Sequence, residues 1–186
     1  QLKAAQGYEV NKSILVSTTD IRRSNSAAMY LALVTHAMNG GEVVTARTAA
    51  RALAQQASEL FTRQGYQENY VNGNFDDYVS IGMGKTPLAF IYEYQMVSFA
   101  LARKGVAADM VLMYPQPTLF NKVVFLATQD RAKMLGEALS TDPTLQRLAV
   151  EHGFRIGDTG AFVAAARAAG LAVEERLTQV VDPPSF

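Results

Sequence analysis

The feature that most constrains this chain is an alternation of short apolar runs with longer helical stretches. The run Ser13–Thr19 (SILVSTT) is apolar and rich in β-branched residues, which is typical of a buried strand. The stretch that follows, SAAMYLALVTHAMNGG, repeats apolar residues at helical spacing and ends in two glycines. Because strands that alternate with helices usually lie parallel in one sheet, we expect an α/β fold with a mixed, mostly parallel sheet flanked by helices.

The rest of the chain continues this alternation. Asn74 is a plausible N-cap for a short helix, because Asp76 and Asp77 would then lie in its first turn, where the helix dipole favours acids. Further helices are predicted at Ala46–Gln64, Phe75–Met83, Tyr94–Gly105, Asp130–Leu139, Asp142–Glu151 and Ala161–Ala169. Further strands are predicted at Pro87–Glu93, Asp109–Pro115 and Thr118–Thr128.

Composition excludes several classes of function. Lys plus Arg and Asp plus Glu both count 17, so a net charge near zero gives no electrostatic footprint for nucleic acid. The absence of Cys removes disulfides, thiolate metal sites and cysteine nucleophiles. No apolar run reaches the roughly 18 residues of a membrane span, so we expect no direct insertion into a membrane.

The sequence offers no recognisable set of catalytic parts. His36 and His152 have no second ligand at metal-binding spacing, and no G-x-S-x-G elbow is present. Gly82–Thr86 (GMGKT) has only one residue between its glycines and precedes a predicted strand, which excludes a P-loop. We therefore expect a protein that is not an enzyme, with no catalytic residue, no metal and no cofactor.

The stretch STTDIRRSNSAAMY places polar residues between the first predicted strand and its helix. Free backbone N–H groups at a helix N-terminus suit an anion, and the hydroxyls of Ser24 and Ser26 would add donors. Arg22 and Arg23 would add positive charge. The alternative is that Ser24 or Asn25 only caps the helix, and the residues alone leave both interpretations open.

A second polar position follows the predicted strand Pro87–Glu93. Tyr92 and Glu93 lie where this strand passes into a helix, and ligands of open α/β sheets bind outside the carboxyl ends of the strands. Tyr92 would equally serve as a core residue and Glu93 as an acid at the start of a helix.

The order of these parts resembles a known family. The stretch STTDIRRSNSAAMY is followed by FDDYVSIGMGKTPLAFIYEYQ, then by ADMVLMYPQPTLFNKVVFLATQD, and then by a helical stretch that ends in LAVEHGFRIGD. This order resembles the C-terminal portion of a type II periplasmic solute-binding protein of an ABC transporter. It is similar in outline to the branch that binds molybdate, sulfate and other oxyanions.

The resemblance implies a fold, a function and a site. Residues 13–117 would form the second lobe, and residues 118–186 would return toward a first lobe that is largely missing. The domain would capture an oxyanion or a carboxylate in the periplasm or outside the cell, and would deliver it to a membrane permease. The two lobes would close on the ligand by a hinge motion. The residues that the resemblance places at the ligand are Thr18, Thr19, Ser24, Asn25, Ser26, Tyr92 and Glu93.

Two other classes stay open at this point. The same two-lobed fold serves as the ligand-sensing effector domain of cytosolic transcriptional regulators. An enzyme of this fold would need a Cys-linked cofactor or a clear catalytic acid, and the sequence shows neither.

Overall fold

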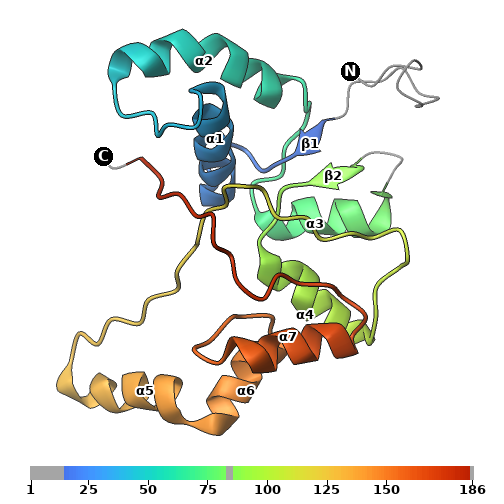
Figure 1. The fold of residues 1–186 in the computed structure, drawn as a ribbon, viewed down its shortest axis with the longest axis vertical. Coiled ribbons are helices and arrows are strands. Elements are labelled where there is room, and N and C mark those ends of the chain that lie inside the picture. Colours follow the sequence, from blue (N-terminus) through green and yellow to red (C-terminus); the bar gives the residue numbers. More distant parts are fainter. Residues whose placement is uncertain (1–14, 83–85, 185–186) are drawn as a thin grey trace. The chain divides into compact units, whose positions relative to one another are not determined.

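A computed structural model describes residues 15–82 and 86–184 of the chain (Figure 1). The chain divides into two compact units, which we describe separately. The first unit comprises Gln1–Ile91 and Asp182–Phe186, and the second comprises Tyr92–Val181. The sequence predicts a different division, at residue 117, which remains a prediction about lobes.

The first unit contains a parallel pair of short strands and the helices that connect them. Its elements are β1 (Val16–Ser17), α1 (Asn25–Met38), α2 (Arg47–Thr62), α3 (Val71–Ser80) and β2 (Leu88–Ala89). Val16 lies opposite Leu88, and Ser17 lies opposite Ala89. Parallel strands need a long crossover connection, which the three helices supply.

Aromatic side chains hold the first unit together. The ring of Tyr30 on α1 lies edge-on to Phe61 of α2, with the ring centroids 5.6 Å apart. The same ring contacts Phe90, just after β2, at 5.2 Å. Ala57 and Phe61 are buried four residues apart on α2, so this helix turns one apolar face inward. These contacts fix α1 beside α2 and next to the end of β2.

Asn74 joins α3 to both strand ends, which corrects its predicted role as an N-cap. Helix α3 begins at Val71, so Asn74 lies inside it and is buried. Its Nδ2 donates to the carbonyl oxygens of Ser17 and Phe90, each at 3.2 Å, and its Oδ1 accepts from Ser17 Oγ at 2.6 Å. The early start also takes Asp76 and Asp77 out of the first turn.

The second unit is a group of helices. It contains α4 (Glu93–Arg103), α5 (Asp130–Thr141), α6 (Pro143–Glu151) and α7 (Thr159–Ala168). Helix α4 packs against α7, α7 against α6, and α6 against α5. Met96 and Ala100 on α4, and Phe162 and Ala166 on α7, are buried at a spacing of four residues. These two apolar faces form the core of the unit.

Gly153 lets the chain leaving α6 lie directly against α4. Its φ is +82°, a left-handed conformation that favours glycine. A Cβ atom at this position would lie 2.4 Å from the carbonyl oxygen of Tyr94 and 2.9 Å from the backbone nitrogen of Ser98. No larger residue fits here unless the backbone moves.

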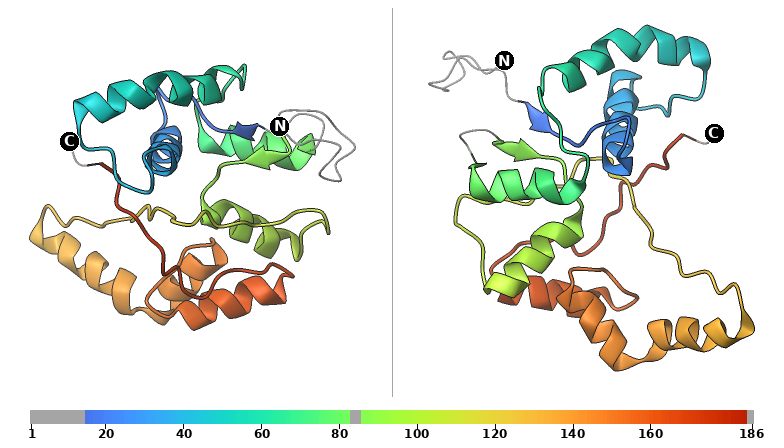
Figure 2. Two further views of the ribbon diagram at one scale, coloured as in Figure 1. Left: turned by 45° about the horizontal axis from the view of Figure 1, so that its top comes forward. Right: turned by 180° about the vertical axis from the view of Figure 1, so that it is seen from behind.

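The two strands predicted at Asp109–Pro115 and Thr118–Thr128 do not form, and these predictions are wrong. Among the described residues, this region contains only an isolated parallel bridge between Thr118 and Val180. Figure 2 shows the stretch before α5 as an extended trace with no strand beside it. Val123 and Leu126 are 81% and 79% exposed. Strand propensity measures how well a side chain packs on a sheet, and the described part of the second unit offers this run no sheet.

The helix predictions are confirmed to within a few residues, while the fold class stays a prediction. The strand predicted at Ser13–Thr19 is confirmed only at Val16–Ser17: Leu15, Thr18 and Thr19 lie outside the strand, and residues 13 and 14 lie outside the described residues. Residues 83–85 of the glycine-rich stretch also lie outside them. Within the described ranges, no helix combines the length and the apolar character needed to cross a membrane.

Candidate functional site

The candidate site is the connection between β1 and α1, residues 17–26, which we call the first junction. The chain leaves the carboxyl end of β1 through Thr18, Thr19 and Asp20, all of them buried. It then turns at residues 21–23 and enters α1 at Asn25. Three polar residues in a row at a strand end are buried here only because each has hydrogen-bond partners.

Gln64 holds Thr18 in place from the end of α2. Its Oε1 accepts from the backbone N–H of Thr18 at 2.8 Å and from Thr18 Oγ1 at 3.1 Å. Its Nε2 donates to the carbonyl oxygen of Leu60 at 3.0 Å. The side chain of Gln64 therefore ties Thr18 to the end of α2.

Asp20 organises the turn that leads into α1. Its carboxylate accepts from Arg22 Nε at 3.0 Å, from Arg22 Nη2 at 2.6 Å and from the backbone N–H of Arg22 at 2.9 Å. The Arg22 hydrogen bonds lower the pKa of Asp20 from 3.8 to about 2. The carbonyl oxygen of Asp20 accepts from the N–H groups of Arg23 and Ser24. The Arg22 side chain is 81% exposed, so it binds the Asp20 carboxylate and remains accessible to solvent.

Three hydroxyls run in a chain from the buried end of the junction to the start of α1. Thr19 Oγ1 lies 2.7 Å from Ser26 Oγ, and Ser26 Oγ lies 2.9 Å from Ser24 Oγ. We call Thr19, Ser26 and Ser24 the hydroxyl chain. Thr19 and Ser26 are buried, whereas Ser24 is only half-buried.

The hydroxyl chain leaves one proton for an outside acceptor. Its three hydroxyls carry three protons, and its two links use two of them. Either oxygen of each link could be the donor. If Thr19 donates to Ser26 and Ser26 donates to Ser24, the remaining proton is that of Ser24, at the more exposed end of the chain.

This free end coincides with the N-terminus of α1. Ser24, one of the two residues that the sequence offers as a cap, occupies the N-cap position, but its side chain makes no capping hydrogen bond. Asn25 is the first helical residue and is exposed. The first turn of α1 contains no acidic residue. The positive end of the helix dipole therefore lies beside the half-buried hydroxyl of Ser24.

The connection from β2 into α4, residues 89–95, is the second junction and is built differently. The backbone N–H of Tyr92 donates to Oε1 of Gln95 at 3.0 Å, which caps the start of α4. Glu93 receives a two-bond fork from Arg155: Nε lies 2.7 Å from Oε2, and Nη2 lies 2.7 Å from Oε1. The hydroxyl of Tyr114 also donates to Glu93 Oε1. Both carboxylate oxygens are therefore occupied.

Burial and hydrogen bonding shift the pKa values around Glu93. Burial raises the pKa of Tyr114 above its ordinary value of 10, and the Glu93 carboxylate raises it further. Burial alone would lower the pKa of Arg155, but the hydrogen bonds and charge interactions with Glu93 and Tyr114 together outweigh burial, and the pKa rises. The Arg155 guanidinium also lies over the Phe162 ring, 4.6 Å from its centroid. Glu93 is thus part of a structural ion pair.

The predicted site residues fall into two groups. Thr18, Thr19, Ser24, Asn25 and Ser26 lie together in the first unit. Tyr92 and Glu93 belong to the second unit, and their approach to the first group stays a prediction.

Sequence reasoning missed the partners of these residues. The Asp20–Arg22 fork spans only two residues, so its signal was present in the sequence. Arg155 lies 62 residues from Glu93, and no local pattern connects the two.

Comparison with known proteins identified no family for this chain. We found no match to a family model, to a curated protein or to a solved structure. In the described ranges, no group of three or more His, Cys, Asp or Glu side chains is placed to hold a metal ion.

Proposed function

We propose that this chain is a non-catalytic solute-binding domain that takes a small oxyanion or carboxylate at the first junction. The observation that carries the proposal is the hydroxyl chain, which ends at the half-buried hydroxyl of Ser24, at a helix N-terminus without a side-chain cap. Backbone N–H groups and a hydroxyl donor at this position suit an anion.

The position of the first junction supports the same conclusion. It follows the carboxyl end of a parallel strand, where ligands of α/β proteins usually bind. Arg22 and Arg23 are exposed beside it and raise the local concentration of anions. The role in ABC-type transport, with a membrane permease as partner, comes from the family resemblance alone.

A thermal-shift screen tests this function. The chain is heated with molybdate, sulfate, phosphate or acetate at constant ionic strength, because a ligand of the native state raises Tm. We expect one class of anion to raise Tm. No shift with any anion, in protein shown to be folded, would contradict the proposed function.

Substitutions test whether the anion binds at the first junction. Ser24→Ala removes the hydroxyl at the more exposed end of the hydroxyl chain, and Ser24→Ala combined with Ser26→Ala should weaken anion binding about ten-fold or more. Ser58→Ala is the matched control, since Ser58 is an exposed helical serine whose hydroxyl donates to the carbonyl oxygen of Gln55. Unchanged affinity in a folded Ser24→Ala/Ser26→Ala variant would remove the hydroxyls from the site.

A further inference from the structure

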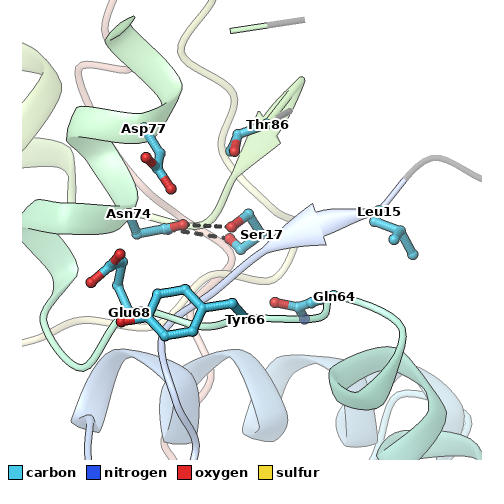
Figure 3. Close-up of a pocket in the computed structure, with 8 residues that line it drawn as sticks. All are labelled: Leu15, Ser17, Gln64, Tyr66, Glu68, Asn74, Asp77 and Thr86. Carbon is cyan, nitrogen blue, oxygen red and sulfur yellow. Dashed lines mark hydrogen bonds between the residues drawn. The ribbon is translucent and has the colours of Figure 1, made fainter. Parts of the chain in front are cut away.

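Residues 119–127 of the second unit, which we call the extended run, have the backbone of a strand without a neighbour. Within the described ranges, no N–H or C=O group of the extended run makes a hydrogen bond. β1 shows the contrast, because it pairs with β2 and its Ser17 also bonds to Asn74 (Figure 3). The extended run therefore keeps the donors and acceptors that a second strand would take up.

The side chains of the extended run are exposed as well. Val124 is 78% exposed and Leu126 is 79% exposed, and every residue from 120 to 126 belongs to the exposed class. Consecutive apolar residues are typical of a strand that is covered on both faces. Because water disfavours such a surface, we expect a partner to cover it.

Helix α5 already lies against one face of the extended run. A Cβ atom at Gly136 would lie 3.2 Å from Cδ1 and Cε1 of Phe125, so the Phe125 ring contacts the helix. Side chains alternate across a strand, so Val123 shares this face, while Val124 and Leu126 point the other way. A pair of strands formed here would have the helix packing that a two-stranded ribbon needs in water.

The sequence of this region fits a second copy of itself. The letters NKVVFLATQ, residues 121–129, place five apolar residues between two polar residues on each side. In an antiparallel pair centred on Phe125, Val124 lies opposite Leu126 of the partner, and polar ends lie opposite polar ends. Lys122 is the one charged residue of these nine, and it then lies opposite Thr128. A parallel pair in register would place the two copies of Lys122 side by side, which is unfavourable.

The exposed apolar surface has the size that a stable dimer needs. A fully exposed apolar side chain presents roughly 100 Å². Seven side chains, each at least 44% exposed, therefore present on the order of 450 Å². A stable interface takes about 800 Å² from each partner, and somewhat more than half of it is apolar. The seven belong to residues 123–126 and, on α5, to Met134, Leu135 and Leu139.

We infer that two copies of this chain associate by antiparallel pairing of residues 123–127 about a two-fold axis. Each copy contributes the same surface, so the contact closes after two copies. The inference does not depend on the proposed anion site, whose residues belong to the first unit.

Sedimentation velocity of the whole chain, over a concentration series in the micromolar range, tests the association. We expect a reversible equilibrium in which the mass rises from 20.2 kDa toward twice that value. A Kd in the micromolar range is expected, because this interface is of ordinary size and has no deep pocket for an anchoring side chain.

Matched variants locate the interface. Val124→Lys places a charge in the centre of the strand pair and should raise the dimer Kd at least ten-fold. Val124→Ile keeps a β-branched apolar side chain and should change the Kd less than about three-fold. Val111→Lys is the control, because Val111 is another exposed valine of the second unit, 64% exposed and outside the extended run. It should leave the Kd unchanged.

An NMR experiment on a mixture of isotope-labelled and unlabelled chains tests the register. Contacts between copies should connect the methyl groups of Val124 with those of Leu126, because these residues lie opposite each other in the pair centred on Phe125. Contacts between the two copies of Val124 as the strongest signals would contradict this register.

Three results of the sedimentation series would overturn the inference. A mass that stays at 20.2 kDa at every concentration would mean that no second copy covers the extended run. Equal weakening by Val124→Lys and Val111→Lys, or weakening by neither, would place the contact on another surface. A mass that grows past the dimer without a plateau would show open-ended association in place of a closed pair.

Discussion

Two strand-to-helix junctions leave the parallel pair of β1 and β2, and they use their polar side chains in opposite ways. At the second junction, Gln95 caps α4, and Arg155 and Tyr114 occupy both oxygens of Glu93. At the first junction, the N-cap residue Ser24 makes no capping hydrogen bond with its side chain, and the hydroxyl chain ends at its half-buried hydroxyl.

The difference separates two uses of buried polarity. A polar group whose partners all lie in the protein stabilises one conformation and leaves nothing for a ligand. A polar group that keeps a donor at its exposed end gives up some stability but gains a binding contact. Polarity at a strand end therefore marks a site only when the fold leaves it unsatisfied.

The largest expected effect comes from replacing Gly153, which lies directly against α4 at the second junction. Gly153→Ala puts a Cβ against the carbonyl oxygen of Tyr94 and should lower the free energy of unfolding by about 3 kcal/mol. Gly170→Ala is the control, since Gly170 also has a positive φ of +74° but nothing within 4 Å of the place that an added Cβ atom would occupy. It should cost about 1 kcal/mol in the same urea titration. Equal costs would show that Gly153 makes no close approach to α4.

Removing the cation of the second junction should have a smaller effect. Arg155→Met leaves the Glu93 carboxylate without its fork and should cost about 2–3 kcal/mol in the free energy of unfolding. The cost is below that of a fully buried pair because both side chains are about one-fifth exposed. Arg147→Met is the control, because its ion pair with Glu151 is largely exposed and should be worth less than about 0.5 kcal/mol. If the two variants lose the same stability, the Arg155–Glu93 pair stabilises the second junction no more than an exposed ion pair would.

A comparison of two N-caps sharpens the description of the first junction. Asp142 caps α6 by accepting from the N–H groups of Thr144 and Leu145, so Asp142→Ala should cost about 1 kcal/mol. Ser24 makes no such bond, so Ser24→Ala should cost only about 0.3 kcal/mol. Chemical denaturation of both variants gives the comparison. A Ser24→Ala loss as large as that of Asp142→Ala would mean that Ser24 is an ordinary cap.

The smallest expected effect is a pH dependence at the first junction. The pKa of Asp20 falls from 3.8 to about 2 on folding, so its stabilising contribution is present above about pH 4. This contribution is lost as the pH falls through about 2, where the folded-state carboxylate becomes protonated. The stability difference between the natural chain and Asp20→Asn should therefore shrink as the pH is lowered from 4 toward 2. A difference that is independent of pH would show that Arg22 does not stabilise the ionised form of Asp20.

The sequence could predict the helices because their signals are local. Apolar spacing and terminal glycines located α1 and α2, and Asp142 before Pro143 located the start of α6. The run Val123–Leu126 has the composition of a strand, yet a strand also needs a neighbour that its own letters do not specify. This run is exposed in the described structure, so its local sequence alone did not predict its conformation.

The candidate site was predictable in part for the same reason. Ser24 and Ser26 lie in a continuous stretch before a helix, which is a readable pattern. Their link through Thr19 depends on how the junction folds back on itself. Arg155 and Glu93 meet only through tertiary packing, so Glu93 alone looked available to a ligand.

The most direct test of the central claim is an NMR titration of the ¹⁵N-labelled chain with sulfate and with acetate at constant ionic strength. If the first junction binds anions, the largest amide shifts will occur at Ser24, Asn25 and Ser26 and will saturate with one Kd. Ser24→Ala will reduce them. Shifts that spread evenly over exposed residues, or that leave the start of α1 unchanged, would contradict the claim that this junction keeps its donors for a ligand.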